Sequence, residues 1–239
     1  MFNIFHNSKK NSTLSILALW TLIAYQLFIK QWDANIFWWL NTLVNKKPFL
    51  GHTIAILNLS NFKVVLASLM GCFLLVYIFL IKDKYSKLEK LTRIILFLIS
   101  VVILIFVCKV VITKLWGFNR PSPTAVFEDS FRVSTLFPNW HIRDISSSSF
   151  PSDNAVALFC WAGIVYYLSG PRLGLAAITF SIFFAMPRIF SGGHWSSDVF
   201  VGSAAIAAII LSAILSKPYR EILESLSKKI CSKAAKINI

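Results

Sequence analysis

Charged residues are scarce in this sequence. Only 14% of the 239 residues are charged, 56% are hydrophobic, and the mean hydropathy is +0.68. Soluble domains usually carry about 25% charged residues. The scarcity excludes an ordinary soluble domain and indicates that the lipid bilayer is the solvent of most of the chain.

Acidic residues are the scarcer of the two charged groups. The chain has 10 Asp and Glu against 24 Lys and Arg, a formal net charge of +14. Basic chains often bind nucleic acid, but here the Lys and Arg residues stand in short blocks between apolar runs rather than along one face. Such blocks are the usual flanks of membrane spans. We therefore expect a lipid bilayer, and no nucleic acid, as the partner.

Cysteine is rare as well, and the four cysteines stand singly at Cys72, Cys108, Cys160 and Cys231. This pattern lacks the spacing of a zinc or iron–sulfur site, and we expect no metal and no cofactor. An internal repeat and a small-residue cleavage site after the first apolar run are also missing. The sequence thus predicts one membrane domain over residues 1–239, with a core at 94–215 and a retained N-terminal anchor.

Long apolar runs dominate what is present. A bilayer core of about 30 Å needs about 20 helical residues, because each backbone amide must be hydrogen-bonded within its own segment. We predict an all-α fold, an integral membrane bundle of six transmembrane helices. The fourth and fifth runs are short, so their outer ends are expected to stop at a protein-lined cavity. The six runs cover residues 14–29, 64–81, 94–112, 155–168, 173–186 and 199–215.

Aromatic and polar residues mix in residues 32–45, after the first run. This segment holds three tryptophans beside Asp33 and three asparagines. The mixture suits a helix that lies in the headgroup layer. We predict an interfacial helix after the first span, with a soluble loop that ends near Pro48 as the alternative.

The distribution of lysine and arginine also indicates the orientation. With the N-terminus inside, the inner segments hold most of the Lys and Arg residues, as the positive-inside tendency requires. Both termini are then cytoplasmic, and the long polar segment 113–152 lies on the outer face, where function is expected. The basic tail 217–239 is interpreted either as an amphipathic helix attracted to anionic lipid or as a solvated tail that only fixes the topology.

The strongest local signal lies between the fifth and sixth runs. Arg188, His194 and Asp198 supply a cation, a nucleophile and a carboxylate. If a helix begins near Trp195, His194 and Asp198 share a face, so that Asp198 accepts a hydrogen bond from one imidazole nitrogen. The other nitrogen then presents a lone pair and is a nucleophile. Gly193 lets backbone amides approach an anion.

Two further clusters follow the third run and open the fourth. Lys114 and Arg120 alone are also explained as snorkelling residues at a membrane exit. Ser152 and Asp153 alone are also explained as a helix cap. The predicted topology brings both clusters to the outer face together with Arg188. Three cations, a hydroxyl and glycine amides suit a phosphate group and stabilise its transition state without a metal.

In these motifs the sequence resembles the type-2 phosphatidic acid phosphatases, or PAP2 family, which includes lipid phosphate phosphatases and vanadium haloperoxidases. The family's third motif is an arginine, five residues, a histidine, three residues and an aspartate, and Arg188, His194 and Asp198 match it in full. The resemblance implies that His194 attacks phosphorus, that Asp198 supports it, and that Arg188 binds equatorial oxygens. It is strongest to bacterial undecaprenyl-diphosphate phosphatases and lipid A phosphatases.

The first motif departs from the family pattern. Five residues rather than six separate Lys114 from the Arg120-Pro121 pair. Either the loop absorbs the missing residue, or Lys109, five residues before Lys114, supplies the cation instead.

The second motif departs more deeply, because Asn154 stands where the family has a histidine that protonates the leaving oxygen. Asparagine cannot act as an acid, and general acid help is typically worth about 10²–10⁴ in rate. Asp153, His141 and His52 are candidate substitutes. Otherwise the leaving group needs little help, as when a phosphate leaves from a lipid diphosphate.

The sequence predicts a metal-independent lipid phosphatase that works through a phosphohistidine at His194. The favoured substrates are an isoprenoid diphosphate or lipid A, and a glycerophospholipid phosphate is the further choice. We expect a bacterial inner-membrane protein with its active site on the periplasmic face. The alternatives are a lipid-to-lipid phosphotransferase and a catalytically silent lipid-phosphate binder. Haloperoxidase activity is remote, because the members with that activity are soluble.

Overall fold

The structure is a computed structural model that describes residues 16, 20, 30–115 and 119–237. These residues contain no β-strand, and one isolated bridge pairs Leu59 with Ile142. The first predicted span, 14–29, lies outside the described residues apart from Ile16 and Trp20. The longer elements are α2 (Lys30–Lys46), α3 (Pro48–Leu57), α4 (Phe62–Leu80), α5 (Lys87–Val110), α7 (Asp153–Ser169), α8 (Pro171–Phe190), α9 (Ala204–Ile214) and α10 (Lys217–Ile237). The shorter ones are the π-helices η1 (Val111–Leu115) and η3 (Asp198–Ser203), helix α6 (Pro123–Val126) and the 3₁₀-helix η2 (Val133–Leu136).

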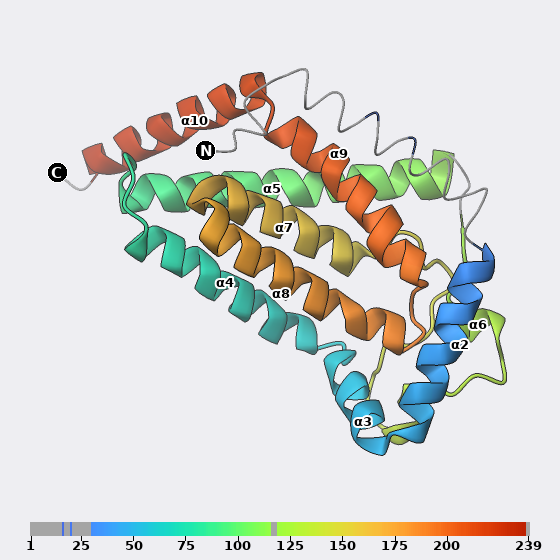
Figure 1. Cartoon of the computed structure of the whole chain (residues 1–239). Coiled ribbons are helices and arrows are strands. Elements are labelled where there is room, and N and C mark those ends of the chain that lie inside the picture. The colour runs from blue at the N-terminus through green and yellow to red at the C-terminus, as the bar shows by residue number, and fades with distance from the viewer. Residues whose placement is uncertain (1–15, 17–19, 21–29, 116–118, 238–239) are drawn as a thin grey trace.

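Helix α7 lies at the centre of the bundle, in contact with α4, α5, α8 and α9 (Figure 1). Most of its apolar side chains, including Trp161, are buried. Gly170, with φ of 84°, ends α7, and Pro171 begins α8, so that a minimal turn connects the two helices. A Cβ atom at Gly174 would lie 2.5 Å from the side chain of Tyr166. The glycine therefore permits the close approach of α8 to α7.

Three helices are long and apolar enough to cross a membrane: α4 with 19 residues, α5 with 24 and α8 with 20. The fifth run is therefore longer than predicted, whereas α7, with 17 residues, is as short as expected. The segment Asp198–Ile214 and helix α10 meet the same test only as a pair that is bent by 63°. The described part of the chain thus has three to four candidate spans of an integral membrane protein, and the count of six stays a prediction.

Helix α2 occupies the segment for which an interfacial helix is predicted. One side of it buries Phe37, Leu40 and Val44, whereas Trp32 and Trp39 are exposed. The buried side packs against α8 and α3 (Figure 1). The helix is confirmed, and its place in the headgroup layer stays a prediction.

The long segment after α5 is tied down at the end of the bundle. Fully buried Asp144 accepts hydrogen bonds from Nη2 of Arg132 at 2.9 Å and from the amide of Ser134 at 2.8 Å. The amide of Arg143 donates to the carbonyl oxygen of Asn58 at 3.1 Å, which joins this segment to the connection between α3 and α4. These bonds hold a loop, rather than a helix, in a fixed place beside the end of α8.

Candidate active site

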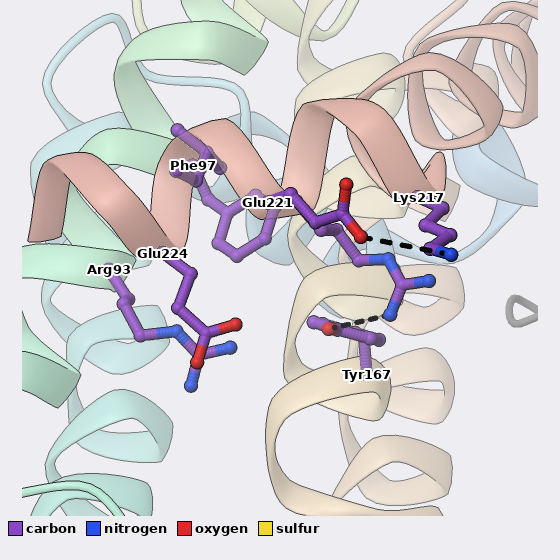
Figure 2. A pocket seen from close by; sticks show the side chains of 8 residues that line it. Arg93, Phe97, Tyr167, Lys217, Glu221 and Glu224 are labelled. Atoms are coloured by element: carbon purple, nitrogen blue, oxygen red, sulfur yellow. Dashed lines mark hydrogen bonds and ion pairs between the residues drawn. The ribbon is translucent and has the colours of Figure 1, made fainter.

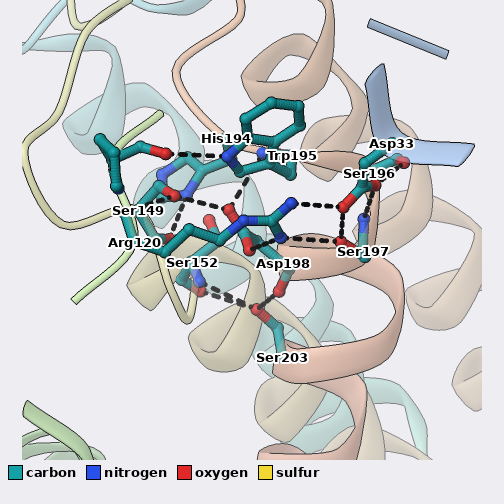
Figure 3. Close-up of polar contacts among 11 residues, drawn as sticks. Asp33, Arg120, Ser149, Ser152, His194, Trp195, Ser196, Ser197, Asp198 and Ser203 are labelled. Carbon is teal, nitrogen blue, oxygen red and sulfur yellow. Dashed lines mark hydrogen bonds and ion pairs between the residues drawn. The ribbon is translucent and has the colours of Figure 1, made fainter. Parts of the chain in front are cut away.

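His194 lies in the tight turn that follows α8, and it is 8% exposed. Its Nδ1 atom lies 2.6 Å from the carbonyl oxygen of Ser149 (Figure 3), and its Nε2 atom lies 3.1 Å from Nη2 of Arg188. A carbonyl oxygen only accepts and a guanidinium only donates. Nδ1 therefore carries the proton, and Nε2 presents a lone pair. Both neighbours select the tautomer in which Nε2 is the nucleophilic atom.

The charge state of His194 suits the same role. Burial, followed by the positive charge of Arg188, lowers the pKa of His194 to about 3. The imidazole is therefore neutral near pH 7, and its Nε2 lone pair becomes available for attack on phosphorus once Arg188 donates to a phosphate oxygen instead.

Asp198 supports His194 in a different way from the one predicted, and the expected direct bond is wrong. Its Oδ2 atom accepts from the hydroxyl of Ser149 at 2.7 Å and from the amide of Trp195 at 3.0 Å (Figure 3). His194 precedes the first helical turn, and Asp198 begins the π-helix η3, so the i, i+4 alignment assumed from the sequence does not form. Asp198 instead fixes the residue whose carbonyl oxygen holds the imidazole.

Arg188, in the last turn of α8, is fixed by two oxygen atoms. Its Nη1 atom donates to Oδ1 of Asn58 at 3.0 Å and to the carbonyl oxygen of Arg143 at 2.8 Å. The amide group of Asn58 in turn donates to the carbonyl oxygen of Pro187 at 2.9 Å. The guanidinium is thereby oriented toward the imidazole. Sequence reasoning missed Asn58, because no motif spacing links it to α8.

Arg120 lies between two buried carboxylates (Figure 3). Its Nη2 atom donates to Asp33 at 2.8 Å, and its Nη1 atom donates to Asp198 and to the hydroxyl of Ser197 at 3.1 Å each. Its Cζ atom lies 4.4 Å from the ring centroid of Trp195. Arg120 thus lies in the same cluster as Asp198, and carboxylates of its own chain determine its orientation, while its binding of phosphate stays a prediction.

Asp33 joins α2 to this cluster, and sequence reasoning treated it only as a polar residue of the headgroup layer. It is 1% exposed and accepts hydrogen bonds from the hydroxyl of Ser196 at 2.6 Å and from the amide of Ser197 at 3.0 Å. The hydroxyl of Ser197 also donates to it. The sequence did contain a signal for this role, because Asp33 is a single carboxylate among tryptophans. A carboxylate in such surroundings is buried only when it is paired.

Residues 90–222 match the PAP2 superfamily. The chain belongs to the PAP2 superfamily. A similar protein, the lipid A 1-diphosphate synthase of Escherichia coli (strain K12), is 31% identical over 215 residues, which are 88% of this chain and 86% of that protein. No solved structure matches the chain at a significant level.

Lys109, rather than Lys114, is the lysine that the structure brings to the PAP2 histidine. Lys109 forms an ion pair with Asp153, and its charge contributes to the lowered pKa of His194. Lys114 lies in η1 and is exposed, without a hydrogen bond or ion pair to a described residue. Lys109 is thus paired with Asp153, and the choice between the two lysines as a phosphate-binding cation stays a prediction.

A small cavity lies beside the PAP2 arginine. Its volume is about 30 Å³, and Arg143, Asn154 and Arg188 are among the residues that line it. The Nε atoms of both arginines and the hydroxyl of Ser152 are buried without a hydrogen-bond partner among the described residues. Unpaired donors of this kind suit an anion. The structure thus places Asn154 on the same cavity as Arg188 and adds Arg143, which sequence reasoning did not single out.

The remaining predicted residues have simpler surroundings. The amide of Gly193 lies 3.4 Å from Oγ of Ser191, and a Cβ atom at Gly193 would lie 3.0 Å from the carbonyl oxygen of Arg143, so its part in anion binding stays a prediction. His52 and His141 are both exposed. In the part of the chain that the structure describes, no three His, Cys, Asp or Glu side chains are grouped as metal ligands.

Proposed function

We propose that this protein is a membrane phosphotransferase that moves a phosphate group from a lipid diphosphate to the phosphate of a second lipid through phospho-His194. The related E. coli protein is named as a synthase of lipid A 1-diphosphate, and the product in that name carries two phosphates at one position. By analogy, we propose lipid A 1-phosphate as the acceptor here. We further propose that the reaction takes place at the periplasmic face of a bacterial inner membrane.

In the first step, Nε2 of His194 attacks the terminal phosphorus of the donor. The bond between this phosphorus and the bridging oxygen breaks, and the electron pair leaves with the lipid monophosphate. Arg188, which donates to Nε2 at 3.1 Å, is placed to donate to the equatorial oxygens of the transferring group. Arg143 and Lys109 add positive charge, since both contribute to the lowered pKa of His194.

In the second step, a phosphate oxygen of the acceptor attacks the phosphorus of phospho-His194. A new phosphorus–oxygen bond forms, the phosphorus–nitrogen bond breaks, and the electron pair returns to Nε2. The acceptor oxygen is already anionic, so that this step needs no general base. Attack by water would need one, because water must lose a proton.

The observation that carries the proposal is the position of Asn154. Its side chain lines the cavity beside Arg188 and Arg143, at the place where the family histidine would give and take protons. The side-chain amide of Asn154 can neither give a proton to the leaving oxygen nor take one from an attacking water. Transfer between two phosphates is the reaction that tolerates this change, since a phosphate leaves and a phosphate attacks.

A groove along α2 suits the hydrocarbon part of a lipid. Its volume is about 460 Å³, and it begins at Asp33 and Ser197 beside the polar cluster and continues along Trp32, Ile36 and Phe200. Apolar walls that end at a few polar groups are typical of ligand sites. A lipid in this groove would enter from the side, with its phosphate directed toward the cluster.

The test follows labelled phosphate from a lipid diphosphate, with purified protein and with or without lipid A 1-phosphate. We expect labelled lipid A 1-diphosphate only when the acceptor is present, with little free phosphate. His194→Ala abolishes the transfer, whereas the matched control His141→Ala, at an exposed histidine, retains it.

Hydrolysis is the second candidate, because the family is named for phosphatases. Rapid release of free phosphate that the acceptor neither slows nor diverts would contradict transfer and establish hydrolysis. Absence of both products, with intact lipid binding, would identify a silent binder.

A further inference from the structure

We propose that the opposite end of the bundle holds a second anion site, which binds the phosphate headgroup of an anionic phospholipid. The site is a cavity of about 370 Å³ between α5, α7 and α10, and its lining includes Arg93, Tyr167, Lys217 and Arg220 (Figure 2). Arg93 and Lys109 lie on the same helix, α5, about 24 Å apart at about 1.5 Å per residue. This cavity is therefore distinct from the site at His194, and the proposal does not depend on the reaction.

Arg93 is the main reason for the proposal. It is 8% exposed, and its Cζ atom lies 3.9 Å from the ring centroid of Tyr85. No hydrogen bond or ion pair joins its guanidinium to another residue in the described part of the chain. A buried cation without a carboxylate partner is costly. An anion in the adjoining cavity would compensate for that cost.

The carboxylates of the same cavity are already engaged. Glu224 accepts from the hydroxyl of Tyr85 at 3.2 Å and lies 3.8 Å from Lys84 and 3.7 Å from Lys228. Glu221 lies 3.9 Å from Lys217 (Figure 2). The acidic groups are thus partly neutralised by lysines, and the arginines give the cavity its positive character.

Arg220 adds a second fixed guanidinium. Its Nη1 atom donates to the hydroxyl of Tyr167 at 3.3 Å, and its Cζ atom lies 5.7 Å from the centroid of the same ring. Two guanidinium groups on different helices can bind the oxygens of one phosphate together.

The position of α10 indicates that the phosphate belongs to a lipid. This helix turns by 63° from the direction of α9 and lies beside α5, where the hydroxyl of Tyr219 donates to that of Ser100 at 2.6 Å (Figure 1). Its exposed residues include Ile222, Leu226 and Ile230, and lysines accompany them along the helix. A basic amphipathic helix beside membrane spans is typical of the membrane surface. A phosphate at this level would be a lipid headgroup.

The experiment measures the thermal stability of the purified full chain in a neutral detergent. Short-chain phosphatidylglycerol is expected to raise the Tm by about 3–5 °C, since a ligand stabilises the state that binds it. Phosphatidylcholine and inorganic phosphate are expected to raise it much less. An equal shift with phosphatidylcholine would overturn the anion site, and an equal shift with inorganic phosphate would overturn the lipid as its ligand.

Variants locate the site. Arg93→Gln is expected to lose most of the shift, Arg93→Lys to keep part of it, and His194→Ala to keep all of it. The matched control Lys236→Gln, on α10 but outside the cavity lining, also keeps it. A full shift in folded Arg93→Gln contradicts the proposal. If that variant does not fold, Lys217→Gln tests the site instead. The Lys217 side chain is 72% exposed, so its replacement should not affect folding. We expect it to reduce the shift, and an unchanged shift overturns the site.

Discussion

The two ends of the bundle differ in how their arginine and lysine side chains are paired. At the His194 end, buried oxygen atoms fix the arginines: Asp33 and Asp198 hold Arg120, and Asn58 holds Arg188. At the α10 end, the lysine–glutamate pairs made by α10 are longer and exposed, as between Lys217 and Glu221 at 3.9 Å. Catalysis requires donors that stand in place before the substrate arrives. At the other end, Arg93 has no such partner in the described part of the chain and is left for an external anion, and the exposed ion pairs near it contribute little.

The largest expected effect comes from breaking the buried pairs. Asp33→Ala leaves Arg120 without one of its two buried carboxylates, and removal of one partner of a buried pair typically costs about 3–5 kcal/mol. We expect a clear fall in Tm together with loss of activity. The matched change at the other end, Glu221→Ala, should leave the Tm nearly unchanged. Equal effects of the two variants would show that the contrast between the ends is false.

The second prediction concerns Asn154. Asn154→His restores a proton donor at the cavity beside Arg188, and it should raise the hydrolysis of a lipid phosphate monoester by about 10². With a lipid diphosphate and the acceptor present, release of the lipid monophosphate should change little, since this leaving group needs no acid. The measurements are free phosphate from the monoester and lipid monophosphate from the diphosphate. A large gain with both substrates would contradict the leaving-group argument.

A smaller effect is expected when the orientation of Arg188 is loosened. Asn58→Ala removes one hydrogen bond to a charged group, typically worth about 1.5–3 kcal/mol, so kcat/KM should fall about 10- to 100-fold. Tyr167→Phe removes the comparable bond to Arg220 at the other end. It should leave kcat/KM unchanged, and a similar fall in both variants would indicate a general loss of folding.

The smallest expected change is in the pH profile. The pKa of His194 is lowered to about 3, so the imidazole stays unprotonated between pH 7 and pH 5. Protonation of the nucleophile should therefore change kcat by less than about twofold in that range. Arg188→Gln removes the second cause of the low pKa, so the acid limb should move to higher pH in the residual activity. A wild-type acid limb near pH 6.5 would show that His194 is not held neutral.

The titration of His194 also makes the stability of the folded protein depend on pH. The lowered pKa of His194 means that the unfolded chain binds a proton more readily than the folded one. The contribution of neutral, buried His194 to the free energy of unfolding is present above the ordinary histidine pKa of about 6.5 and is lost as the pH falls toward 3. The Tm of His194→Gln should consequently fall less between pH 7 and pH 5 than that of the wild type.

The sequence predicted much of the site, because its motifs lie within single segments. Arg188 and His194 are six residues apart, and the turn that joins them brings them into contact. The direct bond from Asp198 to the imidazole was wrong, because His194 lies in the turn before the helix and the Asp198 carboxylate accepts from Ser149 and Trp195 instead. The sequence did not indicate Asp33 and Asn58 as site residues, because they reach the site from other parts of the chain and no motif spacing links them to it.

The sequence by itself determined the helical membrane character and the family motifs, and it predicted His194 as the nucleophile, because apolar length and close spacing act within one stretch of chain. Only the tertiary structure decided which atoms hold that nucleophile. The partners of His194, Arg188 and Arg120 come from segments far apart in the chain, and their contacts depend on how the helices pack. Packing also buries the imidazole, and this burial keeps it neutral.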